Sequence, residues 1–337
     1  MKNLNTVLNR LISNGHANNI CVRVGRGNEI IFSEYKSRDG VIDSSTVFDM
    51  ASVTKILSTT TLTLIAFDKN LMSPDDLVSD YFECPPCHST LSIKHLLTHT
   101  MGIGHKPVNV DGVTYDNVQN YILNIPLDEA VGEKVIYSCP AFILLGKILE
   151  KVFGEKLDTL FDKYVAKPLK MKNSGYLPDK SLNIINHNFN DSDRGVVNDY
   201  NCRYLGGVAG NAGVFSTLDD ITEFAMMLLS CGNPIISKST FEMATRKYCD
   251  GITDSRALGF LYVDDKYTQT GDLFPEGSIG HCGFAGQSVF ADLNSGLYAI
   301  ILSDATTTVT RKYGEVKYDI VMKMREDIHH AIKMDLQ

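Results

Sequence analysis

Segments with the pattern of β-strands stand at both ends of this chain, and segments with helical periodicity fill the middle. Residues 19–35 predict a hairpin, because Ile20, Val22 and Val24 alternate with smaller or polar residues before a glycine-containing turn, and the apolar run 30–32 begins the return strand. Apolar stretches at 257–263, 287–292 and 296–303 predict further strands. Most segments between residues 90 and 235 instead have the apolar spacing of amphipathic helices. This order of elements predicts an α+β fold.

The simplest closure of such a chain is one antiparallel sheet built from both chain termini and flanked by helices, with a mainly helical lobe beside it. Residues 1–60 and 240–337 would form the sheet lobe, and residues 61–239 would form the helical lobe. The amphipathic segment 314–334 predicts a last helix. Because ligand sites are often found between lobes, we expect the functional site in the cleft between these two.

Composition narrows the class of partner. Acidic residues outnumber basic ones, 40 to 32, and the formal net charge is −8, so the chain has no basic excess to attract a nucleic acid. No apolar run approaches the roughly 18–20 residues needed to span a membrane. Apolar residues between Leu4 and Ile12 recur at helical spacing and do not form the continuous stretch of a signal peptide. We therefore expect a cytoplasmic protein whose eight cysteines are mostly thiols.

The segment Ala51-Ser52-Val53-Thr54-Lys55 carries the strongest chemical signal. If it is helical, Ser52 and Lys55 lie on one face, because residues three apart are neighbours on a helix. Burial of Lys55 would lower the pKa of its amine and allow it to take or relay the serine proton. The free N–H groups at a helix N-terminus would favour negative charge at Ser52. The pair predicts an activated serine nucleophile, although the spacing alone also fits an exposed helix face.

Four blocks of this chain are distinctive in combination, and they span nearly its whole length: VFDMASVTK (47–55), HLLTHTMGI (95–103), LGGVAGNAGVFST (205–217) and GHCGFAG (280–286). In this order they resemble the serine β-lactamase and penicillin-binding-protein superfamily, and most closely its branch of class C β-lactamases, D-aminopeptidases and related esterases. The resemblance implies a serine hydrolase that acts through an acyl-enzyme and needs neither cofactor nor metal.

The resemblance also implies a second motif of the form Tyr-x-Asn, for which Tyr137-Ser138-Cys139 is the candidate. Tyr137 should approach Ser52 and Lys55 and carry protons to the leaving group, and either Lys55 or Tyr137 could be the base for acylation. Cys139 replaces the asparagine of the family pattern in this substrate-binding position. Because a thiol is a weak donor and a weak acceptor, recognition of an acylamino side chain is not implied here.

The third family motif falls on His281-Cys282-Gly283, on a strand that should flank the site. By analogy, His281 and Gly283 should contact the substrate, and the backbone N–H groups of Ser52 and Phe284 should form the oxyanion hole. A lysine at the first position of this motif would be a fixed positive charge, whereas a histidine is largely neutral at pH 7. We therefore expect an ester or amide of modest charge as substrate, and poor turnover of β-lactams.

Two other patterns can be read as metal or haem sites. His95 and His99 have a spacing that can bind a metal, but no third ligand is evident, so structural packing is the preferred interpretation. The segment 84–88, with Cys84 and Cys87, fits a haem attachment pattern, a redox pair or half of a zinc knuckle. Haem attachment requires export and a zinc knuckle requires a second cysteine pair, so a solvent loop with two thiols is predicted.

Two functions stay open from the sequence. The first is a serine hydrolase for an ester or amide, with esterase, D-peptidase, amidase or β-lactamase-related activity, or with acyl transfer to an acceptor other than water. The second is a catalytically weak or inactive ligand-binding relative, a penicillin-binding sensor or scaffold, for which the altered Cys139 is the argument. The expected partner is a small molecule or a short peptide or ester. The sequence indicates no oligomeric state.

Overall fold

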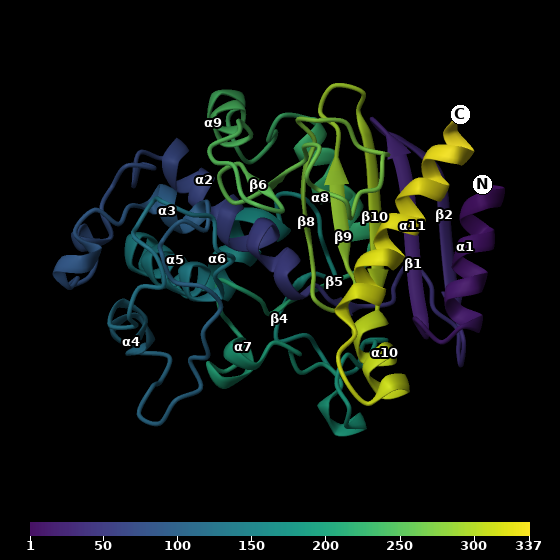
Figure 1. The fold of residues 1–337 in the computed structure, drawn as a ribbon, viewed down its shortest axis with the longest axis horizontal. Coiled ribbons are helices and arrows are strands. Elements are labelled where there is room, and N and C mark those ends of the chain that lie inside the picture. Colours follow the sequence, from purple (N-terminus) through teal and green to yellow (C-terminus); the bar gives the residue numbers. More distant parts are fainter.

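A computed structural model describes all residues, Met1–Gln337, and contains a seven-stranded antiparallel sheet (Figure 1). The strand order is β2-β1-β10-β9-β8-β7-β6. β1 and β10 are neighbours, with Val22 opposite Ile301, so the two ends of the chain meet in one sheet as predicted. The strands are β1 (Asn19–Arg26), β2 (Glu29–Ser37), β6 (Ser255–Arg256), β7 (Leu261–Tyr262), β8 (Ile279–Cys282), β9 (Ser288–Ala291) and β10 (Leu297–Ser303).

The single strand expected at 257–263 is wrong, because a turn at Gly259 separates β6 from β7. Gly259 has φ +81°, and a Cβ at this position would lie 2.1 Å from Oγ1 of Thr60. The turn therefore packs directly against the helical segment that follows Ser52. This contact joins parts of the chain that are far apart in sequence, and the apolar pattern of 257–263 does not reveal it.

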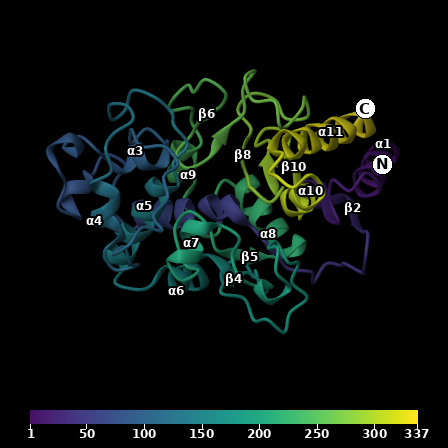
Figure 2. The same ribbon diagram turned by 60° about the horizontal axis from the view of Figure 1, so that its bottom comes forward.

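Helices cover both faces of the sheet (Figures 1 and 2). α1 (Lys2–Ser13) and α11 (Tyr318–Leu336) pack against each other on one face, and α10 (Ala305–Tyr313) precedes α11. In α1 the buried residues Leu4, Leu8 and Leu11 form one stripe toward the core, as the spacing predicts. On the other face α8 (Leu218–Leu229) contacts β1, β9 and β10. The division of the chain into the two expected lobes stays a prediction.

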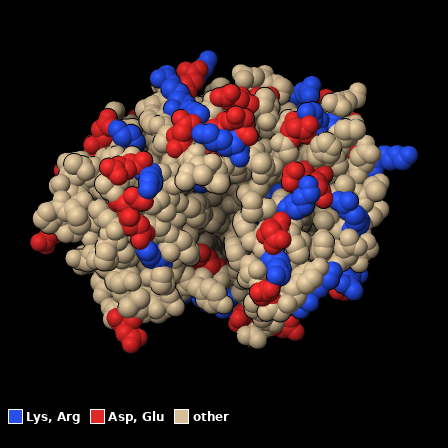
Figure 3. Space-filling view, in the orientation of Figure 1, with Lys and Arg blue, Asp and Glu red and all other residues tan.

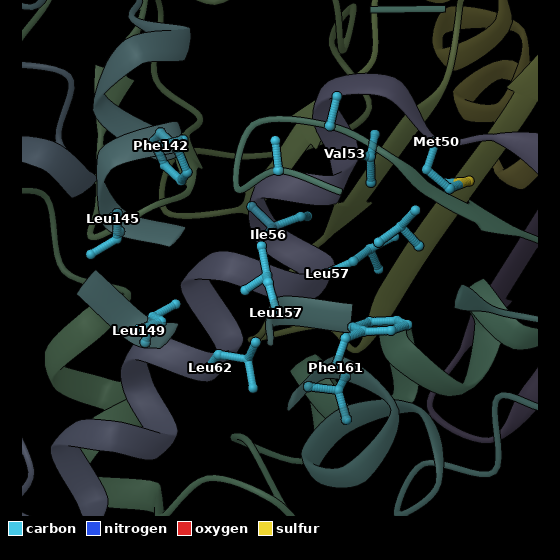
Figure 4. Close-up of a cluster of buried hydrophobic side chains, with 14 of the residues drawn as sticks. Met50, Val53, Ile56, Leu57, Leu62, Phe142, Leu145, Leu149, Leu157 and Phe161 are labelled. Atoms are coloured by element: carbon cyan, nitrogen blue, oxygen red, sulfur yellow. The ribbon is translucent and has the colours of Figure 1, made fainter. Parts of the chain in front are cut away.

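The other helices gather around the segment that follows Ser52 (Figure 4). Leu62, Leu145 and Phe161 belong to three different helices and meet in this buried cluster. Seven consecutive residues of the helix at 61–67 are buried, and a helix with apolar residues on all sides is stable only inside a core. These helices are α2 (Thr61–Asp68), α3 (Ile93–Leu97), α4 (Val118–Leu123), α5 (Cys139–Phe153), α6 (Leu157–Phe161), α7 (Tyr200–Tyr204) and α9 (Lys238–Ala244).

A small second sheet fixes the chain immediately before Ser52. Its three strands, in the order β3-β5-β4, are β3 (Phe48–Asp49), β5 (Val214–Ser216) and β4 (Gly175–Tyr176). Phe48 lies opposite Ser216, and Asp49 lies opposite Phe215. The pairing joins two of the four distinctive sequence blocks, 47–55 and 205–217.

The face of the molecule in Figure 3 is hollowed near its centre, between the half that contains α5 and the half that contains the large sheet. Most atoms around this hollow belong to uncharged residues, whereas Lys, Arg, Asp and Glu are spread over the outer surface. None of the helices combines the length and the apolar character that crossing a membrane would require.

Candidate active site

Ser52 is presented by a short 3₁₀ turn that follows β3. The turn begins with Ala51 at φ +45°, a left-handed conformation that costs a residue other than glycine about 1–2 kcal/mol. The carboxylate of Asp49 accepts hydrogen bonds from the N–H of Ala51 at 2.8 Å and of Asn198 at 2.7 Å. Gln287 donates to the backbone oxygen of Asp49 at 2.5 Å. These contacts hold the strained turn, so that Ser52 stays partly exposed between two buried neighbours.

The side chain of Lys55 is fully buried and lies against Ser52. Its Nζ lies 3.1 Å from the Oγ of Ser52 and 2.9 Å from the backbone oxygen of Asn211. The Sγ of Cys139 lies 3.5 Å from the same nitrogen. Ser52 and Lys55 therefore face each other, as their spacing predicts.

The sequence analysis expected the pKa of Lys55 to be lowered, and this direction is wrong. Burial lowers the pKa of Lys55, but the ionised forms of Cys139 and Tyr137 raise it by more, so that this pKa lies above its ordinary value. Burial also raises the pKa of Tyr137 and of Cys139, against the opposing charge of Lys55. The protonation of Lys55 is therefore coupled to that of the phenol and the thiol, because its pKa is raised only while one of them carries a negative charge.

Tyr137 reaches this pair from the loop before α5. The Nζ of Lys55 lies 5.0 Å from the centroid of its ring, and the charge of Lys55 opposes the effect of burial on the pKa of its hydroxyl. The ring centroid of His99 lies 4.7 Å from that of Tyr137. His99 Nδ1 also accepts a hydrogen bond from the N–H of Ser138 at 3.0 Å. The structure thus brings together the serine, the lysine and the tyrosine predicted from the sequence, and His99 supports the tyrosine from behind.

Cys139 is the first residue of α5 and is only 2% exposed. Its thiol contacts the Nζ of Lys55, which also donates to the backbone oxygen of Asn211. The Asn211 amide also donates to Asp199 at 3.0 Å. The sequence analysis counted Cys139 among the substrate-binding residues, but its burial leaves it in contact with Lys55 and not with the surface of the site.

His281 lies on β8 and is 2% exposed. Its Nδ1 lies 2.7 Å from the backbone oxygen of Cys282, and its Nε2 has no hydrogen-bond partner. Burial, and then the charges of Arg256 and Lys55, hold the pKa of His281 well below its ordinary value. The ring is therefore neutral at pH 7, as we expected, and its centroid lies 6.2 Å from that of Tyr137.

Arg256 on β6 is a charged neighbour of the site that the sequence analysis missed. Its guanidinium carbon lies 5.7 Å from the centroid of the Tyr137 ring, and the residue is 3% exposed. One nitrogen pairs with Asp254, whereas Nε and Nη1 have no hydrogen-bond partner. Buried polar groups are nearly always paired, so these free N–H groups are unusual. No motif marks Arg256, because only the pairing of β6, β7 and β8 brings it to the site.

Gly283 and Phe284 follow β8 beside the turn that carries Ser52. A Cβ on Gly283 would lie 2.9 Å from the backbone oxygen of Met50, so glycine permits a close approach of two backbones. The sequence analysis had instead expected Gly283 to contact the substrate. The N–H of Phe284 donates to no group within the protein, and its ring stacks on Tyr318 at a centroid distance of 5.7 Å. This N–H is free, as a donor to an oxyanion must be.

The two patterns that could be read as metal or haem sites, His95 with His99 and Cys84 with Cys87, show no metal-binding arrangement. His95 Nδ1 accepts a hydrogen bond from the N–H of Ser92 at 3.1 Å, at the beginning of α3. Cys84 and Cys87 are free thiols on an incompletely buried segment. The structure contains no group of three or more His, Cys, Asp or Glu side chains arranged to hold a metal ion. The packing interpretation of His95 and His99 agrees with their contacts.

Comparisons with known proteins match nearly the whole chain. The sequence model of the family described as Beta-lactamase matches residues 6–319. A putative D-alanyl-D-alanine carboxypeptidase of Escherichia coli O157:H7 is 28% identical over 304 residues, which are 77% of this chain and 69% of that protein. Among solved structures, EstCE1, a hydrolase with promiscuous acyltransferase activity, superposes with a TM-score of 0.78 at 18% identity, over 97% of this chain and 98% of that one. A penicillin-binding protein homologue from Caulobacter crescentus superposes with a TM-score of 0.77 at 14% identity, over 98% of this chain and 97% of that one. These two likenesses concern the fold alone.

Proposed function

This chain belongs to the beta-lactamase family and is a serine hydrolase of that superfamily, and we propose that Ser52, Lys55 and Tyr137 are its catalytic residues. One observation carries the proposal: the Nζ of Lys55 lies 3.1 Å from the Oγ of Ser52, and the ring centroid of Tyr137 lies 5.0 Å from the same nitrogen. A partly exposed serine in contact with a cation and a phenol fits the requirements of an activated nucleophile.

In acylation, the Oγ of Ser52 attacks the carbonyl carbon of an ester or amide. Tyr137, ionised beside the charged Lys55, takes the proton from Ser52. The N–H groups of Ser52 and Phe284 hold the negative oxygen of the tetrahedral intermediate. The bond to the leaving group then breaks, and the leaving group receives the proton from Tyr137.

In deacylation, water attacks the carbonyl carbon of the acyl-Ser52 ester and gives up one proton to Tyr137. The ester bond breaks, Ser52 regains its proton, and the acyl group leaves as a carboxylic acid. We assign the base to Tyr137 because the charge of Lys55 lowers the pKa of the phenol against the effect of burial and so favours the phenolate. An acceptor other than water would give acyl transfer by the same steps.

Arg256 favours a substrate with a carboxylate near the scissile bond. Its guanidinium lies beside Tyr137 with two nitrogens unpaired, and a guanidinium binds a carboxylate through parallel hydrogen bonds. The similar E. coli protein is named a D-alanyl-D-alanine carboxypeptidase, and such a substrate ends in a carboxylate. The neutral His281 led us to expect a substrate of modest charge, whereas Arg256 on β6, two strands from His281 on β8, adds a cation to this side of the site.

A matched pair of peptides tests this substrate class. Wild-type enzyme and Arg256→Met are assayed with N-acetyl-D-alanyl-D-alanine and with the same peptide carrying a C-terminal amide. We expect the substitution to lower kcat/KM about tenfold to a hundredfold for the free acid, since a hydrogen bond to a charged group contributes about 1.5–3 kcal/mol. The value for the amide should change far less. Equal losses for both peptides would remove Arg256 from substrate recognition.

The inactive ligand-binding relative is the alternative, and the contacts among Ser52, Lys55 and Tyr137 argue against it. Wild type and Ser52→Ala are compared on p-nitrophenyl butyrate and on a D-alanine p-nitroanilide. We expect turnover of at least one of them by the wild type and its loss in the variant. Equal rates for the two proteins would refute Ser52 as nucleophile. Covalent labelling of Ser52 by penicillin without turnover of any substrate would favour the binding protein.

A further inference from the structure

Arg325 is a buried cation whose guanidinium lies behind the proposed oxyanion hole. It comes from α11, on the outer face of the sheet, and is fully buried. Its Nη1 donates to the Oε1 of Gln269 at 2.6 Å and to the hydroxyl of Tyr318 at 3.2 Å. Its Nη2 donates to the backbone oxygen of Gly283. All three acceptors are uncharged, and Arg325 is part of no ion pair in the structure.

The carbonyl that Arg325 contacts belongs to the same peptide group as the N–H of Phe284. The oxygen of Gly283 accepts one hydrogen bond from Arg325 and a second from the N–H of Gly286 at 3.1 Å. The next carbonyl, that of Phe284, accepts a hydrogen bond from the hydroxyl of Thr306. Both carbonyls on either side of the Phe284 N–H are therefore held, and this fixes the direction in which the N–H points.

We propose that Arg325 is a positioning residue that orients and polarises the Gly283–Phe284 peptide, so that the N–H of Phe284 becomes a stronger donor to the oxyanion. The inference rests on the proposed acyl-enzyme function. A positive charge hydrogen-bonded to a carbonyl draws electron density from the peptide, and the N–H at its other end becomes more positive. The bond from a guanidinium is charge-assisted and roughly twice as strong as one between neutral groups.

The burial of Arg325 makes this effect large. A buried cation without an anionic partner is costly, because its hydration is lost and no opposite charge replaces it. Its field is also little screened, and the Gly283 carbonyl lies directly in it. The burial of this charge lowers the stability of the fold. The group on which the charge acts through the Gly283 carbonyl is the Phe284 N–H.

The test compares Arg325→Gln, which keeps donors but no charge, with Arg325→Lys, which keeps the charge. Removal of a whole oxyanion donor costs about 10²–10³ in kcat. Because the Phe284 N–H remains and is only weakened, we expect Arg325→Gln to lower kcat for p-nitrophenyl butyrate about tenfold to fiftyfold, with KM changed by less than about twofold. Arg325→Lys should recover part of the loss. Gln269→Leu is the control, because it removes a hydrogen-bond partner of Arg325 but keeps the charge. It should lower the melting temperature and leave kcat nearly unchanged.

The outcomes separate this inference from the proposed function. If the wild type hydrolyses the ester and Arg325→Gln, folded by circular dichroism, keeps its kcat, the positioning role is refuted and the acyl-enzyme mechanism stands. If the wild type neither hydrolyses the ester nor reacts with a fluorophosphonate, both are refuted. Should Arg325→Gln fail to fold, phenylalanine-selective ¹⁵N labelling of the wild type decides. The Phe284 amide, assigned with Phe284→Leu, is expected at an unusually low field, and an ordinary shift would contradict polarisation.

Discussion

The thiol sulfur of Cys139 lies 3.5 Å from the ammonium nitrogen of Lys55, in the motif position where an asparagine was expected. A thiol is a weak acceptor, and Lys55 has better partners in Ser52 and in the backbone oxygen of Asn211. The departure of Cys139 from the family pattern therefore leaves the lysine in place. This relationship explains how the site can keep its nucleophile although one motif is altered.

The first prediction concerns this thiol. We expect Cys139→Ala to lower kcat/KM for p-nitrophenyl butyrate only about twofold to tenfold, since one neutral hydrogen bond contributes about 0.5–1.5 kcal/mol. Steady-state kinetics of the two purified proteins measure the effect. A loss of several hundredfold would mean that the thiol takes a direct part in the reaction.

His99 is predicted to support Tyr137. Its ring packs on the tyrosine and its Nδ1 accepts the N–H of Ser138. We expect His99→Ala to lower the free energy of unfolding by about 2–4 kcal/mol, through a cavity and an unpaired N–H, and to lower kcat as Tyr137 loses its support. His95→Ala is the matched control, because His95 contacts Ser92 at a helix end and not Tyr137. His95→Ala should lower the free energy of unfolding by about 1 kcal/mol and leave kcat unchanged. Similar kinetics for the two variants would count against this role.

Asp49 should make the protein less stable as the pH rises. Burial raises the pKa of Asp49 to about 6, whereas in the unfolded chain the carboxyl group ionises near pH 4. Between these values the folded state binds the extra proton, so the free energy of unfolding falls as the pH rises from about 4 to about 6. The shift of about two units corresponds to about 3 kcal/mol.

Urea unfolding of the wild type and Asp49→Asn between pH 4 and pH 7 isolates this contribution from those of other carboxylates. We expect the stability of the variant relative to the wild type to rise with pH by up to about 3 kcal/mol. A difference that stays constant across this range would show that Asp49 titrates alike in the folded and unfolded states.

Gly283 is predicted to matter for both stability and activity, because no side chain fits at this position. An added Cβ would lie 2.6 Å from the Oε1 of Gln287 and 2.9 Å from the backbone oxygen of Met50. We expect Gly283→Ala to cost about 1–3 kcal/mol of stability by overpacking and to lower kcat, because the turn before Ser52 must move. Thermal melts and kinetics check both effects. Gly40→Ala is the control, since its nearest neighbour, Ser37 Oγ, is 3.9 Å away. Unchanged kcat in Gly283→Ala would contradict the coupling.

Much of the fold follows from local pattern. Strand β1 alternates apolar with smaller or polar residues, β10 is a continuous apolar run, and the structure confirms both elements and the hairpin β1–β2. The break at Gly259 was missed because it depends on Thr60, which lies far away in sequence. The expected cytoplasmic location stays a prediction.

In the site, too, residues close in sequence were predicted, whereas residues that tertiary packing brings together were missed. Ser52 and Lys55 are close in sequence, and their spacing on a helical turn was enough to pair them. Arg256 and Arg325 carry no motif, and sheet pairing and helix packing alone bring them near the site. The direction of the pKa shift of Lys55 was predicted wrongly, because Tyr137 and Cys139, which raise this pKa, lie more than eighty residues further along the chain.

The most direct test of the central claim is to locate a covalent adduct. Wild-type protein is treated with a fluorophosphonate, its intact mass is measured, and the modified residue is identified by peptide mapping, with Ser52→Ala and Lys55→Met treated in parallel. We predict one adduct per chain on Ser52, none in Ser52→Ala, and strongly slowed labelling in Lys55→Met. Modification of another residue, or labelling of Ser52→Ala at the wild-type rate, would contradict the account.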